Sequence, residues 1–168
     1  MKSESTEQHR SKSSNDITVG IITLSDSIKS AQSDYSGEYI KKEIISRYNF
    51  QKKILISDDS TELIESIEEL ISSNVDVIIT TGGTGLDLRD ITVETVESLF
   101  DKKMEGFGEI FRLESYKEIG SAALLSRATA GLYKDTLIFS MPGSLNAVKT
   151  ALKIIIDELP HYVYHVKR

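Results

Sequence analysis

Residues 80–92 read TTGGTGLDLRDIT, with three glycines among four consecutive positions and an Arg-Asp pair just beyond them. Glycine lacks a Cβ atom, so such a stretch can turn sharply and bring successive backbone N–H groups close to an anion. A helix that begins soon after the stretch would add positive potential at its N-terminus. The pattern therefore indicates a phosphate-binding loop, with the candidate ligand-contacting residues Gly82, Gly83, Thr84 and Gly85.

The same glycines could instead form a tight turn that needs positive φ and binds nothing. Threonines at positions 80, 81 and 84 favour ligand binding because their hydroxyls add polar groups beside the amides. The stretch matches neither common nucleotide motif, since it lacks the third glycine of the dinucleotide motif and the Lys-Ser/Thr of the phosphate loop. The interpretation therefore rests on backbone chemistry and not on a motif match.

Two aspartates could supply the negative charge that a hard cation needs. Asp90 lies two residues before Thr92, the expected N-cap of a helix. There it would either hold Mg²⁺ together with phosphate oxygens or stabilise the helix dipole by ~0.3–1 kcal/mol. Asp59 and Glu62 form a capping-box pattern, which makes Asp59 the expected N-cap and leaves Asp58 without a structural role. Asp58 and Asp90 are therefore the candidate catalytic and metal-binding residues.

Polar and small residues also follow the first and last expected strands. Ser25 and Asp26 end the first apolar run, and Pro142, Gly143 and Ser144 end the last. Ordinary turns and helix caps would explain either group taken alone. The sequence also allows two roles for each of two arginines. Arg89 is either a surface residue or a phosphate clamp, and Arg127 is either a surface charge or a second anion contact.

Alternating strand and helix patterns must position these loops. Short apolar, β-branched runs predict strands at 17–24, 52–57 and 75–80 and two late strands close together within 127–132 and 135–143. Apolar residues at helical spacing predict helices between them, including one at 104–120 with Ile110 facing inward and a final one stopped by Pro160. This order predicts an α/β fold, a three-layer domain with a central mostly parallel sheet flanked by helices.

In open sheets of this kind, ligands bind beyond the carboxyl ends of the strands. The Ser25-Asp26 pair, Asp58, the glycine stretch and the Pro142-Gly143-Ser144 run all follow expected strands. A doubly wound strand order would bring these four loops to one edge of the sheet. That convergence is stronger evidence for a site than any single motif.

Composition narrows the classes of function. The 168 residues include no cysteine, which excludes thiol catalysis and zinc–thiolate sites. The net charge of −6 lacks the basic field of a general nucleic-acid binder, and no apolar run reaches the ~18 residues of a membrane span. The polar residues 1–16 read as a tail without a secretory signal, and 17–168 as a single domain of a cytoplasmic protein.

The arrangement of these segments resembles the MoaB/Mog family of molybdenum-cofactor biosynthesis proteins. The matching stretches occur in family order and cover nearly all of 17–160: GIITLSDS, SGEYI, ISDD, TTGGTGLDLRDIT, GFGEIFR, LLSRATAGL and LIFSMPGSLNAV. The run LSRATAGLYKDTLIFSMPGS is more similar to the MoaB branch. One departure is Val93, where the family often has proline. Proline there would only preorganise the first helical turn.

The resemblance implies a function: Mg²⁺-dependent transfer of AMP from ATP to molybdopterin, releasing pyrophosphate. Asp58 and Asp90 match the acidic residues that the family uses in catalysis, and the glycine stretch matches its phosphate-contacting loop. The resemblance also implies trimers or hexamers, and contacts with other molybdenum-cofactor biosynthesis proteins. The residues that match substrate-binding loops of the family are Ser25, Asp26, Ser36, Gly37, Ser126, Pro142, Gly143 and Ser144.

Two other functions fit the same residues. A catalytically inactive oligomer that binds molybdopterin or acts as a scaffold would keep the pocket without the reaction. A nucleotide-phosphate hydrolase on a similar domain, like the competence-damage-inducible proteins, would release phosphate or AMP without the pterin. Since a fold does not decide a function, an assay must choose among the three.

Overall fold

The computed structural model describes residues 16–26 and 33–167, so the predicted tail lies almost wholly outside the described residues. The strands are β1 (Thr18–Leu24), β2 (Asn49–Ile56), β3 (Val77–Thr81), β4 (Lys102–Lys103), β5 (Thr129–Tyr133) and β6 (Thr136–Met141). The α-helices are α2 (Tyr35–Ile45), α3 (Ser60–Ser72), α4 (Thr92–Leu99), α5 (Glu105–Ile119), α6 (Leu145–Ile155) and α7 (Leu159–Val166). Two 3₁₀ segments, η2 (Gly120–Leu125) and η3 (Ile156–Glu158), complete the described chain.

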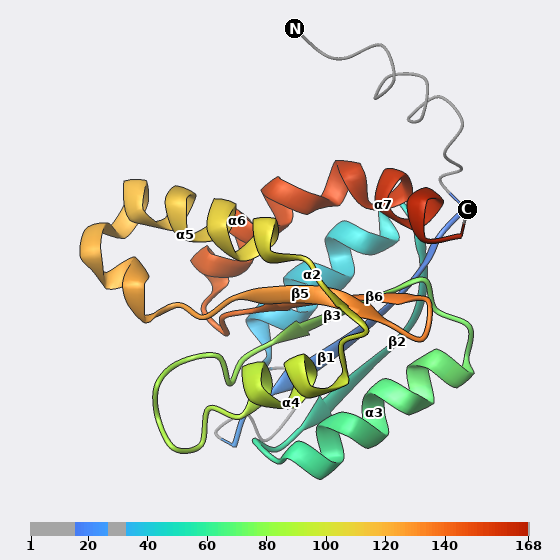
Figure 1. Ribbon diagram of the computed structural model, residues 1–168, viewed down its shortest axis with the longest axis horizontal. Helices are drawn as coiled ribbons and strands as arrows, with labels where there is room; N and C mark the ends of the chain where they lie inside the picture. The colour runs from blue at the N-terminus through green and yellow to red at the C-terminus, as the bar shows by residue number, and fades with distance from the viewer. Residues whose placement is uncertain (1–15, 27–32, 168) are drawn as a thin grey trace, which may run out of the picture.

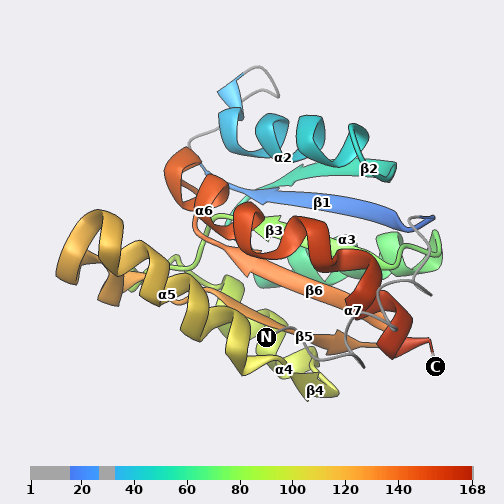
Figure 2. The ribbon, with the colours of Figure 1, turned by 90° about the horizontal axis from the view of Figure 1, so that it is seen from above.

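The six strands form one sheet in the order β2-β1-β3-β6-β5-β4 (Figure 2). β1 pairs in parallel with both β2 and β3, and β3 pairs in parallel with β6. β5 runs antiparallel to β6, and β4 runs antiparallel to β5. The prediction of a mostly parallel sheet is therefore confirmed, and the four parallel strands end at a common edge.

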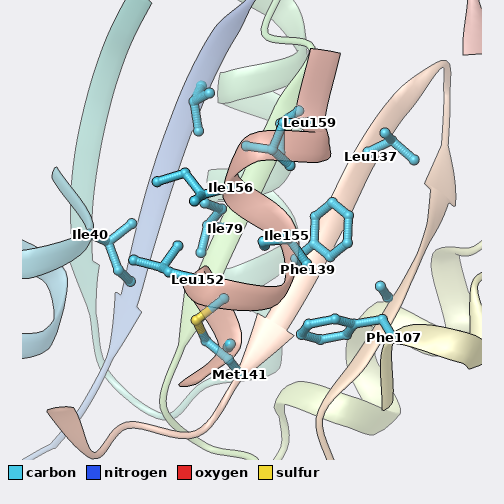
Figure 3. Close-up of a cluster of buried hydrophobic side chains, with 14 of the residues drawn as sticks. Ile40, Ile79, Phe107, Leu137, Phe139, Met141, Leu152, Ile155, Ile156 and Leu159 are labelled. Carbon is cyan, nitrogen blue, oxygen red and sulfur yellow. The ribbon is translucent and has the colours of Figure 1, made fainter. Parts of the chain in front are cut away.

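Helices cover both faces of the sheet. The helices α2, α5, α6 and α7 lie on one face, and α3 and α4 lie on the other (Figure 1). Each face has its own apolar cluster because the strands are apolar on both sides, as expected for a buried parallel sheet. Phe107, Phe139 and Leu152 belong to the cluster under α5 and α6 (Figure 3), and Leu63 and Ile78 to the one under α3. The predicted three-layer arrangement is thus confirmed.

A short hairpin joins β5 to β6, which confirms the two late strands predicted from the sequence. Its turn residues Lys134 and Asp135 have φ of 47° and 62°. Two successive residues with positive φ give the turn a twist that matches the twist of the flanking strands. This hairpin gives the sheet its antiparallel edge.

Two expectations about helices are wrong. Ile110 is 49% exposed, because the buried stripe of α5 runs through Phe107, Phe111 and Ser115 at steps of four residues. Pro160 does not end the last helix; it lies in the first turn of α7, after the 3₁₀ segment η3. Proline suits a first turn because the N–H that it lacks would have no partner within the helix. In the part of the chain that is described, no helix has the length and apolar character to span a membrane.

Candidate functional site

The loops that follow β1, β2, β3 and β6 meet at the carboxyl edge of the sheet (Figure 1). Ser25, just after β1, donates its N–H to the carbonyl of Ile56 at the end of β2, at 3.0 Å. Gly82, just after β3, donates its N–H to the carbonyl of Met141 at the end of β6, at 3.1 Å. Ladder hydrogen bonds therefore continue past the strand ends, and the predicted convergence of the four loops is found.

Asp26 and Asp58 hold each other across the first two loops. The Asp26 N–H donates to Asp58 Oδ2, and the Asp58 N–H donates to Asp26 Oδ1, each at 3.1 Å. The other oxygen, Asp58 Oδ1, is buried and accepts no hydrogen bond from the described residues. Burial raises the pKa of Asp58, and the neighbouring charges of Asp26 and Asp90 raise it further. Asp58 thus has a structural role that the sequence did not reveal, and one oxygen without a partner in the described chain.

Arg89 forms an ion pair with Asp26, so the glycine stretch is tied to the loop after β1. Its side chain is 68% exposed, whereas that of Asp26 is 32% exposed. The predicted alternatives were a surface residue and a phosphate clamp. The structure shows a surface residue with a carboxylate partner at the rim of the site.

The glycine stretch begins with a turn that only glycine makes easily. Gly82 and Gly83 have φ of 102° and 63°. A Cβ at Gly82 would lie 2.1 Å from the Leu24 carbonyl oxygen, and one at Gly83 would lie 2.5 Å from Thr92 Oγ1. Both the strained backbone and the close approach therefore require glycine.

Thr92 supports this turn but is not the predicted N-cap. It is the first residue of α4, whose N-cap is Ile91 without a side-chain cap hydrogen bond. The Thr92 hydroxyl donates to the Gly82 carbonyl at 2.9 Å, and its N–H donates to the Gly83 carbonyl at 2.9 Å. The threonine therefore caps the glycine turn and not the helix.

The hydroxyls of Thr80 and Thr81 have partners within the protein, and Thr84 is buried. The Thr80 hydroxyl donates to Ser140 Oγ at 2.8 Å, and the Thr81 hydroxyl donates to the Pro142 carbonyl at 3.0 Å. Both hydroxyls join β3 to β6 and are not free to contact a ligand. Thr84 is buried, with 3% of its surface exposed.

The backbone of the glycine loop leaves donors available. In the described part of the chain, the N–H groups of residues 83–86 donate no hydrogen bond. Successive free amides in a glycine-rich turn form a concave site for an anion. Phosphate binding by this loop stays a prediction.

Asp90 lies against the same loop. A Cβ at Gly85 would lie 2.5 Å from Asp90 Oδ2, so the absence of a side chain lets the carboxylate approach the backbone. Asp90 Oδ2 accepts the Asp87 N–H at 2.9 Å, and the Asp90 N–H donates to the Asp87 carbonyl at 3.0 Å. Asp87 in turn accepts the Arg89 N–H at 3.0 Å. The loop is therefore closed on itself between residues 87 and 90.

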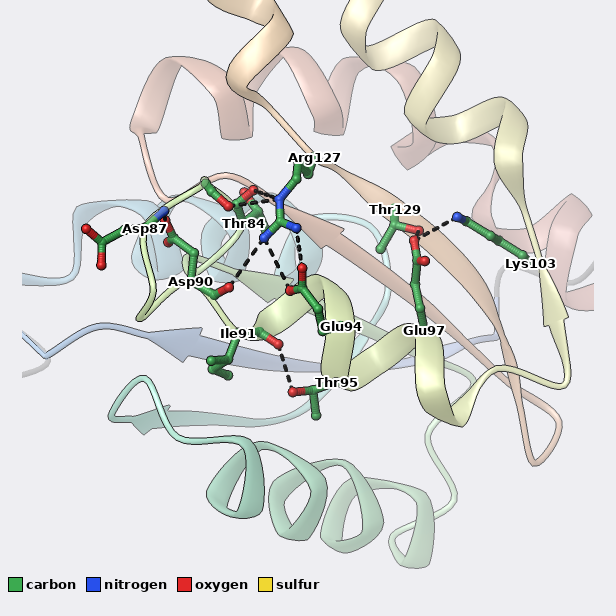
Figure 4. Close-up of polar contacts among 11 residues, drawn as sticks. Thr84, Asp87, Asp90, Ile91, Glu94, Thr95, Glu97, Lys103, Arg127 and Thr129 are labelled. Carbon is green, nitrogen blue, oxygen red and sulfur yellow. Dashed lines mark hydrogen bonds and ion pairs between the residues drawn. The ribbon is translucent and has the colours of Figure 1, made fainter.

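Two residues that the sequence did not single out for their actual roles hold the site from behind. Arg127 donates to backbone carbonyls of the glycine loop and pairs with Glu94 (Figure 4). Asp34 is fully buried at the N-cap of α2 and accepts the Gly37 N–H and the Thr23 hydroxyl, each at 2.8 Å. Arg127 has no local sequence signal, since it contacts residues about 40 positions earlier in the chain. Asp34 does have one, because an aspartate three residues before Gly37 is a helix N-cap pattern.

Asp34 also carries a buried ion pair. Lys53 Nζ lies 2.8 Å from Asp34 Oδ2 and 2.7 Å from Glu38 Oε1. Burial opposes the charge on Lys53, but the hydrogen bonds to Asp34 and Glu38 outweigh it and raise the pKa of the lysine. This network fixes the start of α2, which contains Ser36 and Gly37.

The other candidate residues lie on two sides of the site. The Ser36 hydroxyl donates to the Gly143 carbonyl at 2.7 Å, and Ser144 is the N-cap of α6. A Cβ at Gly143 would lie 3.3 Å from the Gly82 Cα atom, so the loops after β3 and β6 are in contact. Ser126 lies elsewhere, on the wall of a cavity of about 430 Å³ between α4 and α5.

A second cavity of about 420 Å³ lies beside the glycine loop. Leu86, Leu88 and Asp90 line it, together with Arg127 from the far side. Leu86 is 67% exposed and Leu88 is 99% exposed, which is unusual for large apolar side chains. The cavity therefore places apolar side chains beside the Asp90 carboxylate, at the end of the run of free amides 83–86.

The chain is similar to proteins of molybdenum-cofactor biosynthesis. Residues 20–161 match the family model described as "Probable molybdopterin binding domain". A molybdopterin adenylyltransferase of Pyrococcus furiosus is 41% identical over 166 residues, which cover 96% of this chain and 98% of the relative. The molybdenum cofactor biosynthesis protein B of Staphylococcus carnosus is 43% identical over 159 residues, covering 91% and 92%.

Solved structures agree with these relatives. The crystal structure of the tungsten cofactor synthesizing protein MoaB from Pyrococcus furiosus has a TM-score of 0.86 and 42% identity, covering 91% of this chain and 98% of that one. A crystal structure of a molybdenum cofactor biosynthesis protein B has a TM-score of 0.81 and 37% identity, covering 91% and 97%. The chain therefore belongs to the MoaB/Mog family of molybdopterin-binding domains.

Proposed function

We propose that this protein adenylylates molybdopterin in the biosynthesis of the molybdenum cofactor. An oxygen of the terminal phosphate of molybdopterin forms a bond to the α-phosphorus of ATP, the bond from that phosphorus to the bridging oxygen breaks, and pyrophosphate leaves. The Pyrococcus furiosus relative described above, which is named a molybdopterin adenylyltransferase, supports this activity for the chain. The proposal includes a cytoplasmic location, where ATP is abundant, and a single domain from 17 to 168.

The observation that carries the proposal is the position of Asp58. Its Oδ1 atom is buried without a hydrogen-bond partner in the described chain, and it lies 3.2 Å from where a Cβ of Gly83 would be. A carboxylate oxygen without a partner therefore faces the first residues of an amide-lined loop. Buried hydrogen-bond acceptors in folded proteins almost always have a partner. A bound ligand would supply the partner that Asp58 Oδ1 does not find among the described residues.

The same atoms fit Mg²⁺. Asp58 Oδ1 needs a partner, and the charge of Asp90 lies close enough to raise the pKa of Asp58. Within the described chain, no three His, Cys, Asp or Glu side chains are grouped to hold a metal by themselves. Mg²⁺ commonly takes one or two carboxylates and completes its shell with phosphate oxygens and water, so Asp58 and Asp90 would suffice. When bound, the ion would neutralise charge on the phosphates.

The chain's own groups would do the rest by positioning. The free N–H groups at 83–86 would bind phosphate oxygens and keep them in line for attack. Amides that are already oriented stabilise charge without reorganising at the moment of reaction. The exposed side chains of Leu86 and Leu88 would cover the ring of a bound substrate from the cavity side. Ser25, Asp26, Ser36 and Gly37 would line one side of the substrate, and Pro142, Gly143, Ser144 and Ser126 would line the other.

A direct assay tests this function. Purified protein, metal-free molybdopterin and Mg²⁺-ATP are mixed, and adenylated pterin and pyrophosphate are followed by chromatography and mass spectrometry. Equal amounts of both products are expected, with none in Asp58→Asn. Bound pterin without product, under conditions in which an active relative turns over, would instead establish a carrier or scaffold. Phosphate or AMP released without pterin would establish the hydrolase.

We also propose that the protein assembles with copies of itself. Large apolar residues are exposed at steps of three positions along α5, and the following 3₁₀ segment adds two more. A contiguous apolar surface on a soluble domain commonly marks a protein contact. The residues of this surface, here the α5 surface, are Ile110, Leu113, Tyr116, Ile119, Leu124 and Leu125, each between 49% and 75% exposed.

A further inference from the structure

Arg127 connects the two ends of the glycine loop through its guanidinium group (Figure 4). Nε donates to the Gly85 carbonyl at 2.8 Å and to the Thr84 carbonyl at 3.3 Å. Nη2 donates to the Asp90 carbonyl at 3.3 Å. The arginine lies 42 residues after Gly85 in the chain, so a distant segment fixes the shape of the loop.

These contacts determine where the amides of the loop point. In a trans peptide unit the carbonyl and the N–H lie on opposite sides, and no peptide bond in the described chain is cis. Because Arg127 attracts the Thr84 and Gly85 carbonyls, the N–H groups of Gly85 and Leu86 are turned away from it. Those N–H groups are among the donors without a partner in the described residues.

Glu94 fixes the guanidinium in turn. Both of its carboxylate oxygens accept hydrogen bonds from Arg127, one from Nη1 and one from Nη2 at 3.2 Å. Glu94 lies in the first turn of α4, which is packed on the sheet through Val93 and Val96. The arginine is therefore held by a rigid helix on one side and holds a glycine-rich loop on the other.

The contacts also use most of the donors that Arg127 has. The side chain forms part of the wall of both cavities described above, but Nε and Nη2 face backbone oxygens and both terminal nitrogens face Glu94. A planar fork of donors can span several carbonyls at once, whereas a lysine ammonium cannot. This arrangement favours a role in shaping the loop over direct contact with an anion.

We propose that Arg127 is a positioning residue that orients the amides of the glycine loop before substrate binds. The catalytic consequence rests on the proposed function, but the orientation of the loop does not. Loss of the guanidinium would leave the Thr84 and Gly85 carbonyls without their donor. The two peptide units, which carry the N–H groups of Gly85 and Leu86, could then rotate. The loop would then have to be ordered by the substrate itself, which would weaken the binding of phosphate.

The first test follows the loop without any substrate. Amide hydrogen–deuterium exchange is measured by mass spectrometry for a peptide covering residues 82–91 in the full-length protein. Arg127→Gln and Arg127→Lys should both accelerate exchange of the hydrogen-bonded amides in this peptide, those of Asp87, Arg89 and Asp90, the glutamine variant more. Arg112→Gln is the matched control, because Arg112 also donates to a backbone carbonyl nearby, that of Ala128 at 3.2 Å, but does not contact the loop.

The second test separates positioning from general loss of stability. In Arg127→Gln we expect the KM for Mg²⁺-ATP to rise and kcat/KM to fall about 100-fold, as for a misplaced reacting group. Arg127→Lys should recover part of the loss, and added ethylguanidinium should recover part of it in Arg127→Ala. A destabilised fold would not respond to ethylguanidinium.

Unchanged exchange in both Arg127 variants would overturn the proposal, as would equal acceleration in Arg112→Gln. Should Arg127→Gln fail to fold, Arg127→Lys alone decides the exchange test. Accelerated exchange confined to the Arg127 variants supports the proposal even if the wild-type protein transfers no AMP. In that event the proposed function fails while the positioning role stands.

Discussion

Asp26 and Asp58 each accept the backbone N–H of the other at 3.1 Å, so two strand ends are joined by a symmetrical pair of side-chain hydrogen bonds. One oxygen of Asp58 is used in this way, and the other is left buried without a partner in the described chain. The pair explains how two carboxylates lie side by side: each is bound to an amide. It also leaves the protein with a charge that its own fold does not satisfy.

Asp58→Asn should therefore stabilise the free protein at neutral pH while abolishing transfer. Burial raises the pKa of Asp58, so the folded state holds its proton more tightly than the unfolded state does. Its contribution to stability is present below the unfolded pKa and is lost as pH rises through the folded pKa. The asparagine amide does not ionise, so the variant does not lose this part of the free energy of unfolding. Urea unfolding at several pH values measures the difference between the variant and the wild type.

Asp59→Ala is the matched control for that variant. Asp59 accepts the N–H groups of Thr61 and Glu62 as the N-cap of α3, so its loss should lower the free energy of unfolding by about 1 kcal/mol. Activity should persist. Millimolar Mg²⁺ with ATP should raise the Tm of Asp59→Ala but not that of Asp58→Asn. A ligand-induced rise in Asp58→Asn as large as that of the wild type would contradict the assignment of Asp58 to the metal.

Asp90→Asn should lose turnover and keep its fold. The asparagine oxygen can still accept the Asp87 N–H, so the closed shape of the loop is retained while the charge is lost. Asp87→Asn is the control, since its oxygen can still accept the Arg89 N–H. Product formation and circular dichroism are measured in parallel. Full activity of Asp90→Asn would exclude a required charge at this position.

Gly82→Ala should destabilise the protein by about 2 kcal/mol or more, because the new Cβ would meet the Leu24 carbonyl at a positive φ. Gly106→Ala, in α5, should do the opposite and stabilise by ~0.5–1 kcal/mol, since no atom of the described residues lies within 4 Å of the added Cβ. Thermal or urea unfolding measures the change in the free energy of unfolding of each variant relative to the wild type. Equal effects would show that the turn at Gly82 is more adaptable than its contacts indicate.

Asp34→Ala should lower the free energy of unfolding by about 1–3 kcal/mol, since it removes the cap of α2 and leaves the buried Thr23 hydroxyl and Gly37 N–H without their acceptor. Lys53 keeps Glu38 as an ion-pair partner. The raised pKa of Lys53 adds a pH dependence in the wild type. Its contribution is present below the unfolded pKa, about 10.4, and is lost as pH rises through the higher folded value. Urea midpoints should thus fall more steeply above about pH 10 in the wild type than in Lys53→Met. Parallel slopes would refute the pairing.

Leu113→Glu should dissociate the assembly by placing a charge at the centre of the α5 surface. Sedimentation or light scattering would then report a smaller species than the trimer or hexamer expected of the wild type. Ile45→Glu is the control, because Ile45 is 56% exposed on α2, away from this surface. A wild type that is itself monomeric would refute the proposed assembly.

The positions of the loops could be predicted from the sequence because they depend on local patterns. β-branched runs end where polar residues begin, and parallel strands bring such ends to one edge. The sequence therefore predicted that Asp58 and the glycine stretch share one edge, and in the structure Asp58 Oδ1 lies 3.2 Å from where a Cβ of Gly83 would be. The N-caps at Asp59 and Ser144 were predicted for the same reason, since capping is decided within one turn of helix.

The contacts that complete the site could not be predicted in this way. Arg127 acts on Gly85, 42 residues away, and an arginine at a strand start has no pattern that names its partner. Ile110 has helical spacing with Phe107, yet it is 49% exposed. Apolar spacing alone does not distinguish the buried side of a helix from an exposed apolar side. Threonine is a common N-cap residue, so the sequence predicted this role for Thr92. Its hydroxyl instead donates to the Gly82 carbonyl, and the sequence does not show that this carbonyl lies within reach.

The reversed direction of β5 determines where Arg127 lies. Its first residue, Thr129, pairs with Ser140 near the end of β6, so β5 begins where its parallel neighbours finish. A parallel β5 would have carried its leading residues about 16 Å away, to the opposite rim, at ~3.3 Å per residue. Because β5 is antiparallel, Arg127, which precedes it, lies at the carboxyl edge of the sheet. The parallel strands reach that edge only with the residues that follow them.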